Sequence, residues 1–199
     1  MQVTVADLGV GNLHSLKKAL ERLGARVEVT PEIVRWLEAQ VLILPGDGAF
    51  GPMMHRIEDH REALRQRVCE KPALGICIGM QLLFEQSEEA PDVAGLGLLP
   101  GRVVKLPARR LPHMGWNTVE HAKDTLFTGI PQGAYFYFVH SYGITRSEGA
   151  LAWTEYEGRL VAAVRAGPWS YAVQFHPEKS GRRGLKLLEN FLSLAEGAR

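Results

Sequence analysis

The segment ALGICIGMQLLFE, residues 73–85, joins a short apolar run to a helical pattern through a cysteine that lies between two glycines. The run 73–76 has the length and composition of a buried strand, and we expect residues 79–86 to form a helix. A thiol on so tight a connection is unusual, because cysteine otherwise behaves as a small apolar residue of the core. The segment therefore predicts a strand–turn–helix unit with Cys77 at the turn.

The residues before this segment alternate between the same two hydrophobic periods. One face of the predicted helix 11–24 is lined by leucines, whereas the segment VLILP (41–45) is wholly apolar, as expected of a strand covered on both faces. Strands and helices that alternate along a chain favour a parallel sheet with helices on both sides. The predicted strands before residue 73 are 2–6, 26–30 and 41–45, and the predicted helices are 11–24, 31–37 and 52–69.

The pattern changes after about residue 100, where short strand-like segments follow one another through Gly, Pro or charged turns. EYEGRLVAAV (155–164) has the pattern of a β-hairpin that turns at Glu157–Gly158. Helical spacing returns at 182–197. We predict one α/β domain over residues 1–199, with a doubly wound, mostly parallel, flavodoxin-like sheet and an added antiparallel meander in the second half. The meander strands are expected at 102–107, 117–120, 135–142, 151–157, 160–166 and 171–176.

Composition and charge exclude several classes of protein. Apolar residues make up 46% of the 199 residues and charged residues 23%, as in an ordinary globular protein. With a net charge of +1 and no long basic run, the chain lacks the electrostatic surface that nucleic-acid binding needs. No apolar run approaches the ~20 residues that cross a bilayer, and the first residues lack the layout of a secretory signal. We therefore expect a cytoplasmic protein, with no membrane association and with reduced thiols.

The pentapeptide GICIG (75–79) has the spacing of a nucleophile elbow, in which the nucleophile projects from a tight turn between a strand and a helix. The backbone of such a turn is strained, and side chains two residues away on either side would collide, which explains both glycines. At the start of a helix, exposed N–H groups and the helix dipole favour a thiolate at Cys77. The N–H of Ile78 could also bind an oxyanion formed when that thiolate attacks a carbonyl group. The other cysteine, Cys69, ends an ordinary helix and has no such setting.

A thiolate nucleophile needs a base, and His176 is the best placed of the seven histidines. It follows the predicted strand 171–176, and the carboxyl ends of parallel strands are where the active sites of α/β proteins lie. Glu178, held close by the rigid Pro177, could accept a hydrogen bond from the imidazole and fix its tautomer. The sequence therefore predicts that Cys77, His176 and Glu178 act together.

With these motifs the sequence resembles the class I (triad) glutamine amidotransferases. GICIGMQLL and QFHPEKSG are typical of that superfamily, GNLHS and PHMGWN are typical of its histidine-biosynthesis branch, and the likeness extends from about residue 3 to residue 192. The resemblance implies that Cys77 attacks the side-chain amide of glutamine and that His176 protonates the departing ammonia. The other positions that match functional residues of the family are Asp47, Gly48 and Ile78 at the oxyanion, and Gly46, Gln81, Ser141 and Tyr142 around the substrate.

The resemblance further implies a partner, which is a cyclase subunit with a (β/α)8 barrel that receives the ammonia, and it implies neither a cofactor nor a metal. A shielded passage between the subunits makes physical sense, because free ammonia is largely protonated in water and lost. A tryptophan and a methionine beside a turn suit the core of such an interface. The residues that match the docking surface are Asn12, Met114, Trp116, Asn117, Tyr137 and Lys179.

Asp47 departs from the family pattern, which usually has valine at this position. A carboxylate beside a developing oxyanion is unfavourable unless it is paired or points to solvent. We therefore expect the Asp47 side chain to point away from the site.

The sequence leaves three alternatives open. Gly9-Val-Gly11 follows the first strand and Glu28 lies downstream, as in a dinucleotide-binding oxidoreductase, but His14 replaces the third glycine of that motif. A non-catalytic binding module on the same fold is the second alternative. The third is a glutaminase that serves another synthase, of the pyridoxal phosphate or anthranilate type, against which PHMGWN and the short length argue.

Overall fold

The computed structural model describes residues 1–9 and 13–198, arranged as strands and helices that largely follow the predicted order. The strands of the main sheet are β1 (Gln2–Ala6), β2 (Arg26–Thr30), β3 (Leu42–Leu44), β4 (Ala73–Ile76), β7 (His113–His121), β8 (Ala134–His140), β10 (Ala150–Glu155), β11 (Arg159–Arg165) and β12 (Ser170–Val173). A smaller sheet contains β5 (Phe84–Ser87), β6 (Leu99–Lys105) and β9 (Tyr142–Gly143). The helices are α1 (Leu13–Arg22), α2 (Ile33–Glu38), α3 (Phe50–Ile57), α4 (Arg61–Glu70), α5 (Ile78–Gln81) and α6 (Gly181–Gly197), with 3-10 turns η1 (Glu58–His60), η2 (Thr125–Phe127) and η3 (Pro177–Lys179).

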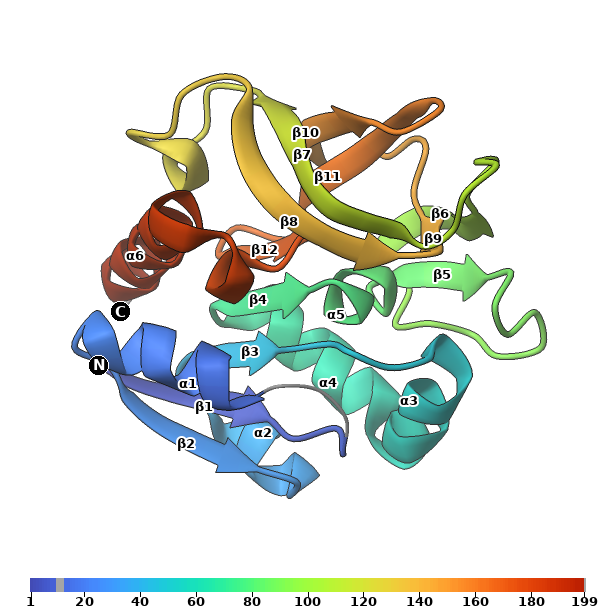
Figure 1. Ribbon diagram of the computed structural model, residues 1–199. Coiled ribbons are helices and arrows are strands. Elements are labelled where there is room, and N and C mark those ends of the chain that lie inside the picture. The colour runs from blue at the N-terminus through green and yellow to red at the C-terminus, as the bar shows by residue number, and fades with distance from the viewer. Residues whose placement is uncertain (10–12, 199) are drawn as a thin grey trace.

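Over the described residues, the main sheet has nine strands in the order β2-β1-β3-β4-β12-β11-β10-β7-β8 (Figure 1). Neighbouring strands are parallel from β2 to β12. From β12 to β8 they are antiparallel. The predicted α/β class, with a parallel sheet in the first half of the chain and an antiparallel meander in the second, is confirmed.

Helices cover both faces of the parallel half of the sheet (Figure 1). On one face lie α1 and α6, whose Phe191 is fully buried, and on the other lie α2, α3 and α4, with Trp36 and Phe50 in the core. Ile43 packs into the first of these layers and Leu44 into the second, which explains why β3 is apolar throughout. Burial of each such large side chain contributes about 1.5–3 kcal/mol.

The single helix predicted over 52–69 is wrong, because the structure breaks it in two. Helix α3 ends at Ile57, the 3-10 turn η1 follows, and α4 begins at Arg61. No glycine or proline marks this break in the sequence. Instead, the acidic pair Glu58–Asp59 occupies the turn that leads into α4, where negative charge favours the start of a helix.

The helix predicted over 79–86 is also wrong in its second half, where the chain becomes strand β5. Helix α5 ends at Gln81, and β5 pairs in parallel with β6 from a later part of the chain. The two end residues of β5 are buried and its two middle residues are exposed, a pattern that resembles a helical repeat over so short a span. Pairing with a distant strand therefore overrides the local signal.

Strands β3, β4 and β12 are neighbours, and their carboxyl ends lie at one edge of the sheet (Figure 1). The register pairs Leu44 with Gly75 and Val173 with Ile76. The sequence predicts a strand that ends at His176, but β12 ends at Val173. The loop after β3, the turn after β4 and the residues after β12 therefore leave the sheet side by side.

Candidate active site

The turn after β4 has the sharp geometry that its two glycines predict. Cys77 has φ 53° and ψ −109°, which is a left-handed conformation that a non-glycine residue rarely adopts. A Cβ atom added to Gly75 would lie 2.6 Å from the carbonyl oxygen of Gly79, and one added to Gly79 would collide with the carbonyl of Leu44. The N–H of Cys77 donates to the carbonyl of Val173 at 2.8 Å, which ties the turn to β12. The elbow is therefore packed against β3 through Leu44 and hydrogen-bonded to β12 through Val173.

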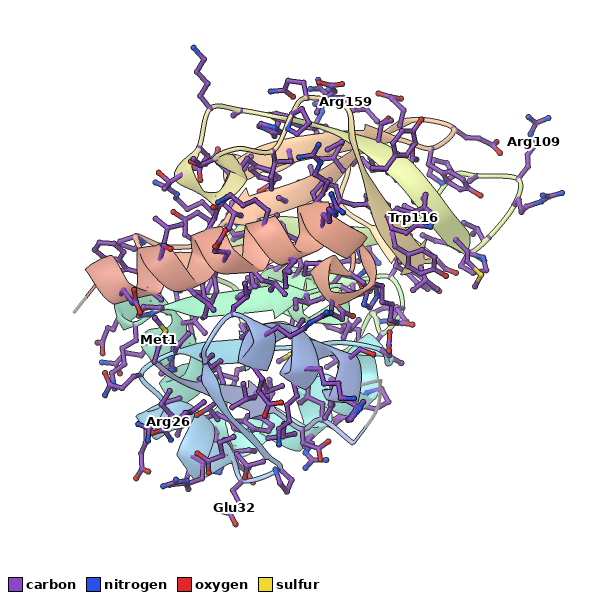
Figure 2. All side chains as sticks on the ribbon, turned by 60° about the vertical axis from the view of Figure 1, so that its left-hand side comes forward. Met1, Arg26, Glu32, Arg109, Trp116 and Arg159 are labelled. Carbon is purple, nitrogen blue, oxygen red and sulfur yellow. The ribbon has the colours of Figure 1, made fainter. Side chains whose placement is uncertain are left out.

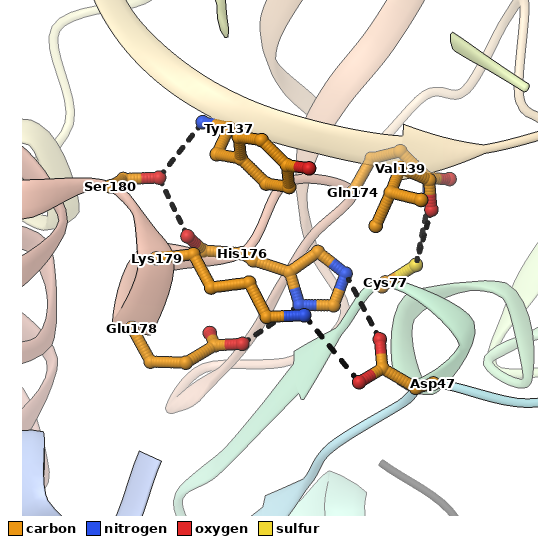
Figure 3. Close-up of polar contacts among 9 residues, drawn as sticks. All are labelled: Asp47, Cys77, Tyr137, Val139, Gln174, His176, Glu178, Lys179 and Ser180. Atoms are coloured by element: carbon orange, nitrogen blue, oxygen red, sulfur yellow. Dashed lines mark hydrogen bonds and ion pairs between the residues drawn. The ribbon is translucent and has the colours of Figure 1, made fainter. Parts of the chain in front are cut away.

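The side chains of His176 and Glu178, 2% and 6% exposed, form a pair beside this elbow (Figure 3). The imidazole Nδ1 donates to Glu178 Oε1 at 2.8 Å, because a carboxylate can only accept. Burial alone would lower the pKa of His176, but hydrogen bonds and charge from Cys77 and Glu178 raise it to about 10. The arrangement therefore holds a proton on the imidazole next to the thiol.

The backbone of His176 is anchored to the antiparallel half of the sheet. Its N–H donates to the carbonyl of Tyr137 at 2.9 Å. The Ser180 hydroxyl donates to the carbonyl of His176 at 2.6 Å and accepts from the N–H of Tyr137 at 2.9 Å (Figure 3). Strand β8 thus fixes the residue that the sequence alone placed only at the end of a strand.

The expected orientation of Asp47 is wrong, because its carboxylate points toward the site. Oδ1 lies 3.6 Å from His176 Nε2, and Oδ2 lies 3.5 Å from Lys179 Nζ (Figure 3). Two positively charged groups on the segment after β12, those of His176 and Lys179, attract the carboxylate across the gap. No local pattern predicts that Lys179 lies near Asp47, because the two residues are 132 positions apart in the chain. The Asp47 side chain is 37% exposed, so water partly screens these contacts.

A cavity of about 240 Å³ opens in front of the elbow, smaller than the roughly 300–1,000 Å³ pockets that hold drug-sized ligands. It brings together all seven residues predicted at the oxyanion and around the substrate. Sequence reasoning missed three further residues of its wall, of which Glu89 is the most informative; its Oε2 accepts from the Phe50 N–H at 2.7 Å. The lining residues are Gly46, Asp47, Gly48, Cys77, Ile78, Gln81, Glu89, Val139, His140, Ser141 and Tyr142.

Gln174 is the other functional candidate that sequence reasoning missed. It is buried beside the elbow, and its Nε2 lies 3.5 Å from Cys77 Sγ. The signal was present in QFHPE, where Gln174 precedes His176 by two residues, but that spacing reads as part of an ordinary strand. In the structure Gln174 follows the end of β12 at Val173, and its side chain contacts the thiol.

The residues predicted for docking divide into two groups. Met114 and Trp116 of β7 are 61% and 56% exposed. Trp116 (Figure 2) packs edge-on against Tyr137 of the paired strand β8. Tyr135, which the sequence did not single out, is 59% exposed on the same strand pair. Asn117 instead turns inward. Lys179 faces Asp47, and Asn12 lies outside the described residues.

Within residues 1–9 and 13–198, no group of three or more His, Cys, Asp or Glu side chains could hold a metal ion. In the same part of the chain, every helix is too short or too polar to cross a membrane.

A cysteine on a nucleophile elbow, with a buried histidine–glutamate pair at the carboxyl edge of a doubly wound sheet, defines an enzyme of the class that transfers acyl groups through a thiol. The family model described as glutamine amidotransferase class-I matches residues 4–194. The chain belongs to this family. Its membership sets aside the dinucleotide-binding and non-catalytic alternatives.

Two curated relatives carry the same name, imidazole glycerol phosphate synthase subunit HisH. The protein from Thermococcus kodakarensis is 45% identical, over 96% of this chain and 100% of that protein. The one from Moorella thermoacetica is 48% identical, over 98% of this chain and 96% of that protein. A solved glutamine amidotransferase has a TM-score of 0.76 at 24% identity and covers 98% of both chains. At that identity, the solved structure supports the fold alone.

Proposed function

We propose that this chain, as one domain over residues 1–199, is the glutaminase subunit of imidazole glycerol phosphate synthase in cytoplasmic histidine biosynthesis, and that it hydrolyses glutamine to glutamate and ammonia. The observation that carries the proposal is the 2.8 Å contact between His176 Nδ1 and Glu178 Oε1, beside a cysteine that lines a cavity. The names of the relatives supply the pathway.

In the first half-reaction, the thiolate of Cys77 attacks the carboxamide carbon of glutamine, and the carbonyl oxygen becomes an oxyanion. The N–H groups of Ile78 and of the Asp47–Gly48 segment would donate to that oxyanion. The imidazolium of His176 gives its proton to the amide nitrogen, the C–N bond breaks, and ammonia leaves. A glutamyl thioester remains on the sulfur.

In the second half-reaction, the neutral imidazole of His176 takes a proton from water as the water oxygen attacks the thioester carbonyl. The C–S bond then breaks, which releases glutamate and regenerates the thiolate beside an imidazolium. Glu178 keeps Nδ1 protonated throughout and stabilises the imidazolium. The pKa of His176, raised to about 10, suits a resting state in which the imidazole already holds the proton that ammonia needs.

The cavity wall offers partners for the charged end of glutamine. Glu89 is our candidate for the α-ammonium group, since it lies in the wall and its other interaction is with a backbone N–H. Gln81, Ser141 and Tyr142 line the same cavity and would bind the remaining polar atoms. The tight fit of Gly46 against the side chain of Ile78 would hold the oxyanion loop against the elbow.

The partner that we propose is a cyclase subunit with a (β/α)8 barrel, which uses the ammonia to form imidazole glycerol phosphate and the aminoimidazole carboxamide ribonucleotide (AICAR). The outer side of β7 and β8 is the proposed docking surface, because it exposes Met114 and Trp116 together. Lys179 and Tyr137 would link that surface to the active site, since Lys179 contacts Asp47 and Tyr137 holds the backbone of His176.

The test is ammonia release from glutamine, measured with and without the cyclase subunit of the Moorella thermoacetica synthase and its nucleotide substrate. We expect the cyclase and its substrate to stimulate release at least tenfold, and Cys77→Ser to abolish release. Cys69→Ser is the matched control and should keep full activity, because Cys69 is exposed on α4.

Full activity in the isolated chain, indifferent to the cyclase, would exclude this synthase and favour a glutaminase of another system. Activity that survives in Cys77→Ser would exclude the thiol mechanism itself.

A further inference from the structure

The carboxamide of Gln174 connects the nucleophile to a neighbouring side chain. Its Nε2 donates to Cys77 Sγ at 3.5 Å, and its Oε1 accepts from Gln81 Nε2 at 3.1 Å. Both Gln174 and Gln81 are at least 97% buried, with 1% and 3% of their surface exposed. Because Gln81 must donate to an acceptor, the Gln174 amide can have only the orientation that points its N–H at sulfur.

The orientation of Gln81 is fixed in turn by a backbone carbonyl. Gln81 Nε2 donates its second hydrogen to the carbonyl of Tyr142 at 2.9 Å, so neither of its N–H bonds is left over. His140 Nδ1 lies 2.8 Å from the same carbonyl and must donate to it. The Tyr142 carbonyl is therefore held from two sides, by Gln81 and by His140.

A second histidine continues this chain toward the surface. His140 Nε2 lies 3.0 Å from His113 Nδ1, and His113 Nε2 lies 3.1 Å from Asn117 Nδ2. The Asn117 carboxamide cannot exchange its oxygen and nitrogen without losing hydrogen bonds. Nδ2 also donates to the carbonyl of Glu155 at 2.8 Å, and Oδ1 accepts from the N–H of Thr118 at 2.8 Å.

These contacts admit only one arrangement of protons. Asn117 donates to His113 Nε2, His113 Nδ1 donates to His140 Nε2, and His140 Nδ1 donates to Tyr142. Both imidazoles must then be neutral, since an added proton would place two donors face to face. Burial lowers the pKa of His113 to about 4 and that of His140 to about 3, in agreement with this arrangement.

We propose that Gln174 is a positioning residue for the thiolate of Cys77, and that the neutral pair His113–His140 holds the Tyr142 carbonyl on which the orientation of Gln81 and Gln174 depends. A hydrogen bond from the Gln174 N–H to the Cys77 sulfur stabilises the thiolate and fixes its position before substrate binds. The inference rests on the proposed glutaminase function for its consequence in catalysis, but its effect on the thiol exists without substrate.

The test uses a Cys69→Ser background, so that Cys77 is the one thiol of the chain. Gln174→Met removes the donor at similar volume, and Gln174→Glu replaces it with an oxygen. In both variants we expect the pH at which alkylation by iodoacetamide reaches half its maximal rate to rise by about one unit. In the complex with the cyclase, kcat should fall about tenfold or more, with KM changed less than about threefold.

His140→Phe extends the test to the far end of the chain and should raise the alkylation pH in the same direction, by a smaller amount. His121→Phe is the matched control, because the ring nitrogens of His121 lie 2.9 Å and 3.0 Å from the carbonyls of Ala122 and Ile130, outside the network that connects Asn117 to Cys77. It should leave the alkylation profile unchanged.

An unchanged alkylation profile in both Gln174 variants would overturn the inference, whatever happens to kcat, since a purely structural role lowers activity without moving the profile. That result would leave the glutaminase function standing if wild-type protein releases ammonia and Cys77→Ser does not. If the Gln174 variants shift the alkylation profile but the wild-type protein does not hydrolyse glutamine, the positioning role of Gln174 holds and the proposed substrate is wrong.

Discussion

Asp47 and Cys77 both lie on the Nε2 side of the His176 imidazole (Figure 3), and the competition between them for its proton sets the activity of the resting site. His176 Nε2 is the atom that must serve the thiol, yet the Asp47 carboxylate approaches it to 3.6 Å. Lys179 holds the other carboxylate oxygen at 3.5 Å. A negative charge in this position competes with the thiolate for the imidazolium and repels an oxyanion that forms nearby.

We therefore predict that Asp47→Asn and Asp47→Val raise the basal glutaminase kcat of the isolated chain about tenfold, which corresponds to about 1.4 kcal/mol of activation free energy. The gain should shrink at high salt, because the carboxylate is partly exposed and screened even in the wild type. Ammonia release at two ionic strengths measures both effects.

Asp59→Asn is the control for this prediction, since it removes a carboxylate from η1, outside the cavity wall. Its kcat should match wild type. A kcat that stays constant or falls in both Asp47 variants would mean that the carboxylate leaves the imidazole before substrate binds and does not restrain the reaction.

The elbow shows how three short segments become one rigid unit at the scale of secondary structure. Gly46 follows β3 and packs against the side chain of Ile78, while Gly79 approaches the carbonyl of Leu44. Close contact without side chains lets α5 begin directly against the end of β3. The oxyanion loop and the nucleophile are thus held by the same packing.

Gly79→Ala should therefore cost stability as well as activity. The new methyl group would push the elbow away from Leu44, and overpacking of this kind costs about 1–3 kcal/mol. Urea unfolding measures the loss as a lower midpoint. Gly197→Ala is the control, because a methyl group there meets nothing within 4 Å. Equal midpoints for the two variants would show that the elbow relaxes freely.

Sequence signals succeeded where a residue's surroundings are local. The strand Ala73–Ile76, the elbow and the hairpin turn at Glu157–Gly158 each have a signal carried by residues a few positions apart, and each was predicted. Strand β5 was missed because its partner β6 lies farther along the chain. Glu89 was missed for the same reason, since only its contact with the N–H of Phe50 places it at the cavity.

The whole molecule joins two halves through one strand. Strand β12 pairs in parallel with β4 and antiparallel with β11, so the elbow of the first half and the histidines of the second half meet at its end. No local pattern predicts that insertion, although the meander itself was predicted. Its consequence is a site in which charged His176 and the neutral pair His113–His140 are buried within one continuous structure.

These opposite protonation states predict a stability maximum near pH 6.5. Below pH 6.5, His113 and His140 bind protons in the unfolded chain but stay neutral in the folded protein, because their folded pKa values are about 4 and about 3. Stability is therefore lost as the pH falls. Above pH 6.5, stability is lost toward pH 10, because folded His176, with a pKa of about 10, keeps a proton that the unfolded chain releases.

The acid side of this maximum separates the histidine pair from other titrating groups, because most carboxylates titrate below about pH 5. We expect the unfolding free energy to fall by about 1–2 kcal/mol between pH 6.5 and pH 5.5 in wild type. The double variant His113→Phe/His140→Phe should flatten that slope even if it is less stable at every pH, whereas His55→Asn, which removes an exposed histidine from α3, should keep it.

If the double variant does not fold, imidazole NMR signals of wild type supply the answer, since two histidines should remain neutral at pH 5. A wild-type slope of zero, or titration of all seven histidines above pH 5, would contradict the neutral pair and with it the single proton arrangement that orients Gln81 and Gln174.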